Sequence, residues 1–456
     1  MEEWKSKRLS VKQKLGFGIF DLGGNMFFTL MGFWSLKYLT DIVGVAAAWA
    51  GIAVMAGKVW DAVTDPVMGF ISDRTLTRWG RRRPYLLAGA VPMMFAMWLF
   101  FSAPNIDKPV LLVLWVSLAL MLLNTVSTVI NIPYSSLTPE LTGDYHERSS
   151  LNGYRFGCAV FGTILGAAAV QPIVDFFAGI GPGNIRFGWS MMGLSLGAVM
   201  TLVTLLTFFG VREKRHSAKD LPTKGFFATY RQVFSNRPYV ILLLTYSLNI
   251  MGITFLQSIL AYYTEYVYKR PDITPLAMMI LLLTAMVCIP LSVMVSKRIG
   301  KKRTYQICFA VIASACMVIF LLGQRLGPNF FLIFMVYAGI GVGFGYVAPF
   351  AMVPDTVEYD AAKTGERKEG AYYGIWTFIS KLGTSFSVFL SGLLLSIGGY
   401  VANAEQGGKA IFAITLLIGP VPALTLLGAM ILIEKYTLDE KAYQELIAAA
   451  GKNNSA

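Results

Sequence analysis

The sequence predicts an all-α membrane protein with twelve transmembrane helices in two six-helix halves. The chain has 456 residues, of which 55% are hydrophobic and only 14% are charged, whereas soluble domains carry about 25% charged residues. Apolar runs long enough to cross a bilayer recur along most of the chain. The basic motif RWGRRRPY at 78–85 returns as RIGKKRTY at 298–305, which indicates an internal repeat.

Each predicted half contains six apolar stretches. Each stretch is about as long as a membrane-spanning helix, which needs about 20 residues. In the first half they lie at about 16–40, 45–72, 85–103, 109–137, 153–178 and 188–210. In the second half they lie at about 238–267, 275–296, 304–323, 330–353, 371–397 and 409–433. We therefore divide the chain into an N-terminal half at 1–212, a cytoplasmic inter-half loop at 213–237, and a C-terminal half at 238–456 with a short cytoplasmic tail.

Repeated halves of the same topology are typical of carriers in which one half rocks against the other around a central site. A channel would more naturally need a pore-lining filter, for which the sequence gives no signal. We accordingly expect alternating access rather than a pore.

The positive charges predict the orientation of the spans. Although the net charge is +13, most of the 39 Lys and Arg residues fall in the termini and in every second loop. The other side carries six, which are Lys108, Arg186, Lys269, Arg270, Arg325 and Lys409. This bias predicts that both termini are cytoplasmic in a multi-pass protein of the cytoplasmic (inner) membrane. The orientation of the spans also accounts for the net charge of +13, so we do not expect nucleic-acid binding.

Other sequence features argue against several protein classes. The four cysteines lie in apolar segments without metal-like spacing, so they imply neither a metal site nor a disulfide framework. The N-terminal segment lacks the apolar core of a secretory signal peptide. The only histidines, His146 and His216, fall in expected cytoplasmic loops. Without a nucleophile and base together, we expect no enzyme.

The second predicted span carries the strongest functional signal. Lys58, Asp61 and Asp65 follow one another at helical spacings of three and four, so they share one face of the helix. A charge in hydrocarbon costs at least about 2.5–3.5 kcal/mol, so these groups must face a polar interior. One interpretation is structural neutralisation by Lys58 and the nearby arginines. The other is a cation site, since small hard cations prefer carboxylate oxygens, or a group that takes up a proton.

Further polar side chains lie inside predicted spans. Asn124, Thr128 and Asn131 form one stripe on the fourth span, ahead of Pro133. The first span carries Asp21 and Asn25, and the tenth carries Tyr346. The eleventh carries Lys381 with Tyr373 and Trp376 nearby. Aromatic faces combined with charged or amide groups are typical of sugar sites, although each aromatic alone is as consistent with packing.

The motifs together resemble a known family. In chain order they are GFGIFDLGGN, TDIVG, KVWDAVTDPVMGFISDR, RWGRRRPY, INIPYSSLTPELTGDYHER, VPDTVEYD and YYGIWTFISKLG. This order resembles the glycoside–pentoside–hexuronide:cation symporters, the melibiose-permease-like branch of the major facilitator superfamily. The resemblance covers roughly residues 10 to 430 and implies a fold of the major facilitator type.

The resemblance also implies roles for individual residues. It implies a cation site, a metal site if sodium is the coupling ion, at Asp61 and Asp65 with Thr128 and Asn131. It implies a substrate site whose members are Asp21, Asn25, Asn131, Arg155, Tyr346, Tyr373, Trp376, Thr377 and Lys381. Asn25 and Asn131 stand where melibiose permeases carry acids, and Ser135 stands where they have a stacking tryptophan. These departures leave the sugar and the choice between sodium and proton open.

We therefore expect a monomeric secondary transporter that moves a sugar or glycoside together with Na⁺ or H⁺ and uses no other cofactor. The alternative is a cation-coupled carrier of an amphiphile such as a lysolipid, because the wider group also moves such molecules. A continuous apolar portal would favour the lipid, whereas polar groups at the midplane favour the sugar. A non-transporting sensor would need an added signalling domain, which the sequence does not predict.

Overall fold

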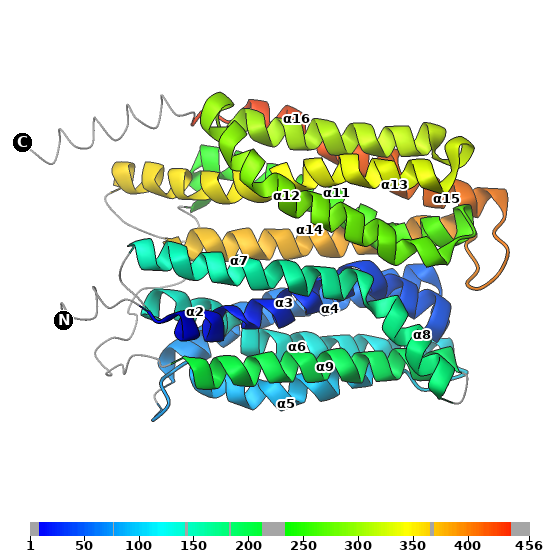
Figure 1. The fold of residues 1–456 in the computed structure, drawn as a ribbon, viewed down its shortest axis with the longest axis horizontal. Helices are drawn as coiled ribbons and strands as arrows, with labels where there is room; N and C mark the ends of the chain where they lie inside the picture. Colours follow the sequence, from blue (N-terminus) through cyan, green and yellow to red (C-terminus); the bar gives the residue numbers. More distant parts are fainter. Residues whose placement is uncertain are drawn as a thin grey trace, which may run out of the picture. The chain divides into compact units, whose positions relative to one another are not determined.

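The computed structural model describes residues 9–75, 77–141, 145–181, 184–211, 233–364 and 369–438. Within these ranges every regular element is a helix (Figure 1). The first part of the chain forms α2 (Val11–Gly18), α3 (Phe20–Lys37), η1 (Tyr38–Val43), α4 (Ala47–Arg74), α5 (Arg83–Phe100), α6 (Pro109–Leu141), α7 (Tyr145–Ala168), α8 (Val170–Ile180) and α9 (Ile185–Gly210). The second part forms α11 (Arg237–Tyr262), η3 (Tyr263–Val267), η4 (Pro271–Ile273), α12 (Thr274–Ile299), α13 (Lys301–Thr364), α14 (Glu369–Ile397), α15 (Gly408–Ile418) and α16 (Pro420–Glu434).

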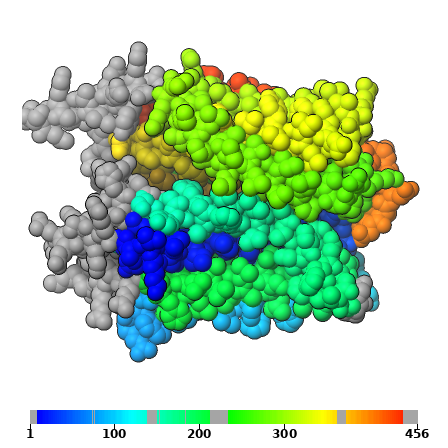
Figure 2. Space-filling view, viewed as in Figure 1, coloured from blue at the N-terminus to red at the C-terminus, as the bar shows by residue number. Residues whose placement is uncertain are grey.

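The helices group into two compact units. One comprises Met1–Pro222 with Val401–Ala404, and the other comprises Thr223–Tyr400 with Glu405–Ala456. In the first unit α3 packs on α7, α4 on α6, and α5 on both α6 and α9. In the second unit α11 packs on α14 and α16, and α12 packs on α13. Figure 2 shows the side chains of neighbouring helices in close contact within each unit. The predicted inter-half loop lies mostly outside the described residues, as does the end of the tail, and both stay predictions.

The described helices confirm the predicted class of all-α membrane protein. Eight of them are long and apolar enough to cross a bilayer, or nine if the bent pair Gly153–Ala168 and Val170–Ile180 is one span. One of these eight, α13, is broken at Gly327, whose φ of 79° and ψ of −174° are not helical, so it contains two helices. The count of twelve spans stays a prediction, because α3 and α4 are less apolar than these eight helices.

Glycines allow α7 to lie directly on the backbone of α3. A Cβ atom at Gly162 would overlap the carbonyl oxygen of Leu22, and one at Gly166 would overlap that of Met26. At the end of α2, just before α3, a Cβ at Gly18 would come within 3.1 Å of the backbone nitrogen of Arg155. This contact sets how far the side chains of α7 reach across α3.

We predict that Gly162→Ala destabilises the protein by about 1–3 kcal/mol or more, because the added methyl group forces two helix backbones apart. Gly157→Ala on the same helix is the matched control, since a Cβ there meets nothing within 4 Å. Alanine is favoured over glycine in a helix by about 0.5–1 kcal/mol, so the control should be neutral or stabilising. Thermal unfolding of the purified variants measures both. Equal unfolding temperatures would contradict the close helix contact.

Two π-helical turns form a second repeat of the two units. In the first unit α3 ends in η1, Tyr38–Val43, and in the second unit α11 ends in η3, Tyr263–Val267. Both fit the pattern Tyr-x-Thr-acid-x-Val, as YLTDIV and YYTEYV. In each, the threonine hydroxyl donates to the carbonyl three residues earlier, at 3.3 Å for Thr40 and 3.0 Å for Thr264. The two units therefore share a local distortion as well as a basic motif.

Candidate functional site

Two carboxylates of α4 converge on one hydroxyl of α6. The Thr128 Oγ1 atom donates to Asp61 Oδ1 at 2.7 Å, and it lies 3.0 Å from Asp65 Oδ1, to which the same proton can be donated instead. Asp61 and Thr128 are buried, at 4% and 3% exposure, and Asp65 is half-buried. The structure thus brings together three of the four residues predicted for the cation site.

The local sequence explains why these oxygens gather here. Asp61 and Asp65 are one turn apart on α4, so their side chains leave the helix on the same side. The next residue, Pro66, has no backbone N–H and cannot donate to the carbonyl of Ala62. The carbonyl of Ala62 therefore receives no hydrogen bond from the residue four positions later. One turn before Asp61, the Asn124 amide of α6 donates to the carbonyl of Gly57 at 2.9 Å.

Lys58 turns toward α3. Its Nζ atom lies 5.7 Å from the centroid of the Phe28 ring, within the range of a cation–π interaction. The prediction that Lys58 balances the charge of Asp61 stays a prediction.

A second polar group joins α3, α6 and α7. Arg155 Nε donates to Asp21 Oδ2 at 2.7 Å, and Nη2 donates to Asp21 Oδ1 at 3.3 Å, so the guanidinium grips both carboxylate oxygens. The Tyr134 hydroxyl donates to Asp21 Oδ2 at 2.5 Å. The guanidinium also lies 5.1 Å from the Tyr134 ring centroid and 5.5 Å from that of Phe17. The side chains of Arg155 and Asp21 keep 24% and 15% exposure, so solvent still reaches the pair.

Sequence reasoning paired neither Asp21 with Arg155 nor Tyr134 with either. Arg155 and Asp21 are 134 residues apart, and only the α3–α7 packing brings them together. A signal for Tyr134 was present, because it lies three residues after Asn131 and so continues the polar stripe of α6.

The two asparagines of this region bond to their own helices. Asn25 Nδ2 donates to the carbonyl of Asp21 at 2.9 Å. Asn131 Nδ2 donates to the carbonyl and to the hydroxyl of Ser127, both at 3.0 Å. The Asn131 Oδ1 atom lies 3.6 Å from where a Cβ of Gly24 would be, so the side chain faces α3. Their predicted roles stay predictions.

In the second unit, α14 separates the predicted substrate residues into two faces. Tyr373, Thr377 and Lys381 are spaced four residues apart on one face, where Tyr373 is 42% exposed and Lys381 is half-buried. Trp376 is only 3% exposed and stacks on Tyr246 of α11, with ring centroids 4.1 Å apart. The structure therefore places Trp376 in the core, where it supports the helix.

The remaining member of the predicted substrate set, Tyr346 of α13, is 49% exposed. Its role stays a prediction.

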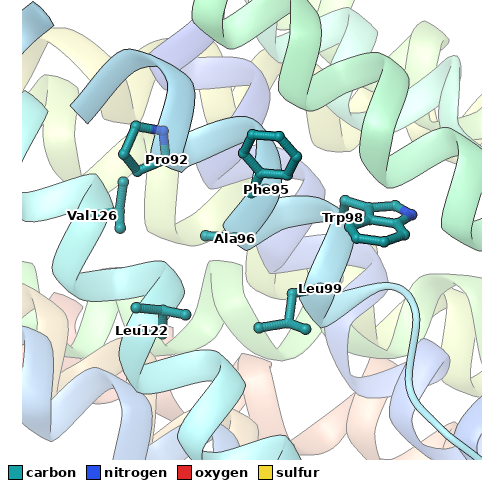
Figure 3. Close-up of a pocket in the computed structure, with 7 residues that line it drawn as sticks. All are labelled: Pro92, Phe95, Ala96, Trp98, Leu99, Leu122 and Val126. Atoms are coloured by element: carbon teal, nitrogen blue, oxygen red, sulfur yellow. The ribbon is translucent and has the colours of Figure 1, made fainter. Parts of the chain in front are cut away.

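An apolar groove of about 270 Å³ lies between α5 and α6 (Figure 3). It is lined by Pro92, Phe95, Ala96, Trp98, Leu99, Leu122 and Val126. The polar atom of its tryptophan, Trp98 Nε1, donates to Ser190 Oγ at 3.0 Å and is thus already engaged. The groove suits hydrocarbon rather than a sugar, which needs several hydrogen-bonding groups.

Comparison with known proteins gives a consistent result. Residues 16–440 match the model of the family described as MFS/sugar transport protein. The uncharacterized symporter YnaJ of Bacillus subtilis is 30% identical over 448 residues, which cover 97% of this chain and 95% of the relative. A putative sulfoquinovose importer of Escherichia coli is 29% identical and covers 96% of this chain and 93% of its own. The sodium-dependent lysophosphatidylcholine symporter 1-A of Danio rerio is 25% identical over 96% and 88% of the two chains.

The fold also has solved counterparts. A structure from a study of substrate recognition in proton-dependent oligopeptide transporters superposes with a TM-score of 0.67 over 96% of this chain and all of that one, at 12% identity. At that identity the likeness concerns the fold alone. Together with the family match over nearly the whole chain, it confirms the expected architecture: the chain belongs to the MFS/sugar transport protein family, and it is a membrane symporter rather than an enzyme.

Proposed function

We propose that the protein is a cation-coupled symporter of a sugar or glycoside, with separate cation and sugar sites in its first unit. The contact that supports this most directly is the Thr128 hydroxyl within 3.0 Å of both Asp61 and Asp65. Two carboxylates with a hydroxyl and a nearby backbone carbonyl offer the oxygen ligands and negative charge that a dehydrated Na⁺ requires. The same carboxylates can carry H⁺ instead.

The sugar site, in this proposal, is built around Asp21 and Arg155. A carboxylate and a guanidinium are strong hydrogen-bond partners for sugar hydroxyls, and both keep some exposure. In the second unit, Tyr373, Thr377 and Lys381 give one face of α14 an aromatic ring, a hydroxyl and an ammonium, which are groups that can also bind a sugar. Trp376 acts indirectly, because its stacking on Tyr246 fixes the rotation of that helix.

The second candidate substrate is a lysolipid, which the likeness to the lysophosphatidylcholine symporter and the apolar groove on α5 and α6 support. The groove is remote in sequence from the charged pair, and its lining offers nothing for a zwitterionic headgroup. We therefore place the sugar first.

Uptake into proteoliposomes tests the proposal. Vesicles with an imposed Na⁺ gradient or an imposed pH gradient are offered neutral glycosides, acidic sugars and lysophosphatidylcholine. We expect accumulation of a sugar that collapses when the matching gradient is dissipated. Accumulation of the lysolipid alone, or uptake of a sugar that no cation gradient drives, would overturn the proposal.

We further propose that both termini are cytoplasmic and that the protein lies in the inner membrane as a monomer. The topology predicts that single cysteines at Trp79 and Ile299, in the equivalent basic motifs, react with an impermeant thiol reagent only from the cytoplasmic side. A cysteine at Lys108, on the opposite side, is the control and should be labelled in intact cells. Labelling at position 79 or 299 in intact cells would contradict this orientation.

Lys381 is expected to link cation binding to sugar binding. An ammonium within a membrane span needs an anionic partner, so the charge of Lys381 is expected to respond when the charge of the cation site changes. Since coupling between two sites is reciprocal, Lys381→Ala should remove the effect of the cation on sugar affinity while the protein still reaches the membrane. Sugar affinity at low and high cation concentration measures this. An unchanged cation dependence would reduce Lys381 to a bracing role.

A further inference from the structure

The cation site is accompanied by a contact whose purpose the proposed binding does not explain. Asn124 of α6 is 3% exposed, and its Nδ2 atom donates to the carbonyl oxygen of Gly57 on α4 at 2.9 Å. Gly57 lies four residues before Asp61, and Asn124 lies four residues before Thr128. The two bonds are therefore successive rungs between the same faces of the same two helices. The Thr128 bond reaches the proposed cation ligands. The Asn124 bond reaches Gly57, one helical turn before Asp61.

The contact between Asn124 and Gly57 limits how closely α4 and α6 approach each other. A Cβ atom at Gly57 would lie 3.1 Å from Asn124 Nδ2 and 3.1 Å from Leu120 Cβ, so only glycine permits this spacing without displacement. A leucine would fill the volume of Asn124 without the desolvation penalty of a buried amide. The buried hydrogen bond from Asn124 to Gly57 therefore fixes the position of α4 along α6 more than it improves the packing between them.

We propose that Asn124 is a positioning residue for the cation site and that its bond to Gly57 sets the affinity and size selectivity for the cation. Because α4 is one continuous helix through Gly57, Asp61 and Asp65, fixing Gly57 on α6 fixes both carboxylates relative to the Thr128 hydroxyl. Selectivity between cations follows cavity size and the rigidity of the ligands. Binding sites need their ligands held to within about 0.5 Å. This inference rests on the proposed cation site.

The test uses the metal ions alone, so it does not depend on knowing the sugar. Purified protein is titrated with NaCl or LiCl at constant ionic strength, with choline chloride as balance, and the cation-dependent rise in unfolding temperature gives a binding midpoint. Asn124→Leu should raise the midpoint for Na⁺ by about threefold to tenfold, the effect of one net hydrogen bond. It should also change the ratio of the Li⁺ and Na⁺ midpoints by about threefold. If neither ion stabilises the wild type, the proposed selectivity of Asn124 for metal ions is overturned.

Matched variants separate positioning from general stability. Thr201→Val removes another bond from a side chain to a helix carbonyl in the same unit, the 2.6 Å bond from Thr201 to Ala90. It should lower the unfolding temperature and leave the cation midpoints unchanged. Gly57→Ala disturbs the rung from the other helix and should shift the midpoints in the same direction as Asn124→Leu. Asn124→Gln, which keeps the donor, should be less affected and serves if the leucine variant does not fold.

Two failures can be told apart with Asp65→Asn in the same assay. If Asp65→Asn retains cation stabilisation, the proposed cation site itself is wrong. If Asp65→Asn loses it while Asn124→Leu and Gly57→Ala keep wild-type midpoints and the wild-type Li⁺ to Na⁺ ratio, Asn124 only packs the helices and the inference is overturned.

Discussion

Asp65→Asn is expected to abolish cation-driven accumulation while the protein still reaches the membrane. The variant keeps the shape of the side chain and its hydrogen-bonding reach to Thr128, which lies 3.0 Å away. It removes one of the two negative charges that offset the dehydration of the cation. Loss of a charge partner in a buried site costs about 3–5 kcal/mol, which corresponds to an affinity loss of more than about 100-fold.

Uphill uptake in vesicles with an imposed cation gradient measures this loss. Asp175→Asn makes the same chemical change on α8, where the carboxylate is held by Gln171 at 2.8 Å, and should transport like the wild type. Accumulation by Asp65→Asn at the wild-type level would remove this carboxylate from the coupling mechanism.

Arg155→Ala should lower sugar affinity by at least about 100-fold and leave the cation midpoint near its wild-type value. A charge-assisted hydrogen bond from the guanidinium to a sugar hydroxyl is worth about 1.5–3 kcal/mol, so the loss of two such bonds weakens binding by at least about 100-fold. The single variant also leaves the Asp21 carboxylate without that partner, so a loss of thermal stability accompanies the loss of binding.

The double variant Asp21→Asn/Arg155→Gln distinguishes binding from stability. It removes both charges and keeps two groups that can bond to each other, so thermal stability should recover relative to Arg155→Ala. Sugar binding should not recover, because neither charged partner remains. Recovery of sugar affinity along with stability would mean that the pair only braces α3 against α7.

The parts of this molecule that followed from the sequence are those governed by local periodicity. The spacing of Asp61 and Asp65 placed both on one face of α4, and the spacing of Asn124, Thr128 and Asn131 did the same on α6. The resemblance implied that the two stripes share one site, and in the structure the Thr128 hydroxyl lies within hydrogen-bond distance of both acids.

The parts that did not follow depend on how distant helices approach. The grip of Arg155 on Asp21 requires α7 to lie against the α3 backbone, which depends on glycines whose meaning appears only once both helices are placed. The rotation of α14 that buries Trp376 depends on Tyr246, 130 residues earlier in the chain. Helical spacing alone also could not separate the role of Asn124, which bonds to a backbone carbonyl, from that of Thr128.

The helices that carry the acids of the proposed sites are less apolar than most other long helices that the structure describes. The helices α3 and α4 fall outside the set that is apolar enough to span. They carry Asp21, Asp61 and Asp65, the acids of both proposed sites. Each buried charge lowers the mean hydropathy of its helix, so the physical signature of function is also what weakens the sequence signal of the span.

The matched π turns at Tyr38–Val43 and Tyr263–Val267 carry information about the ancestry of the chain. A π turn holds about one residue more than the α turn it replaces, so one extra residue at the same place in both units would account for the matched turns. The simplest history is one insertion in an ancestral six-helix gene, followed by duplication and fusion. Since then the copies have diverged around a kept threonine: Lys37 precedes the motif in one and Ala261 in the other. The matched π turns therefore supply a landmark for aligning the two halves that is independent of the basic motifs at 78–85 and 298–305.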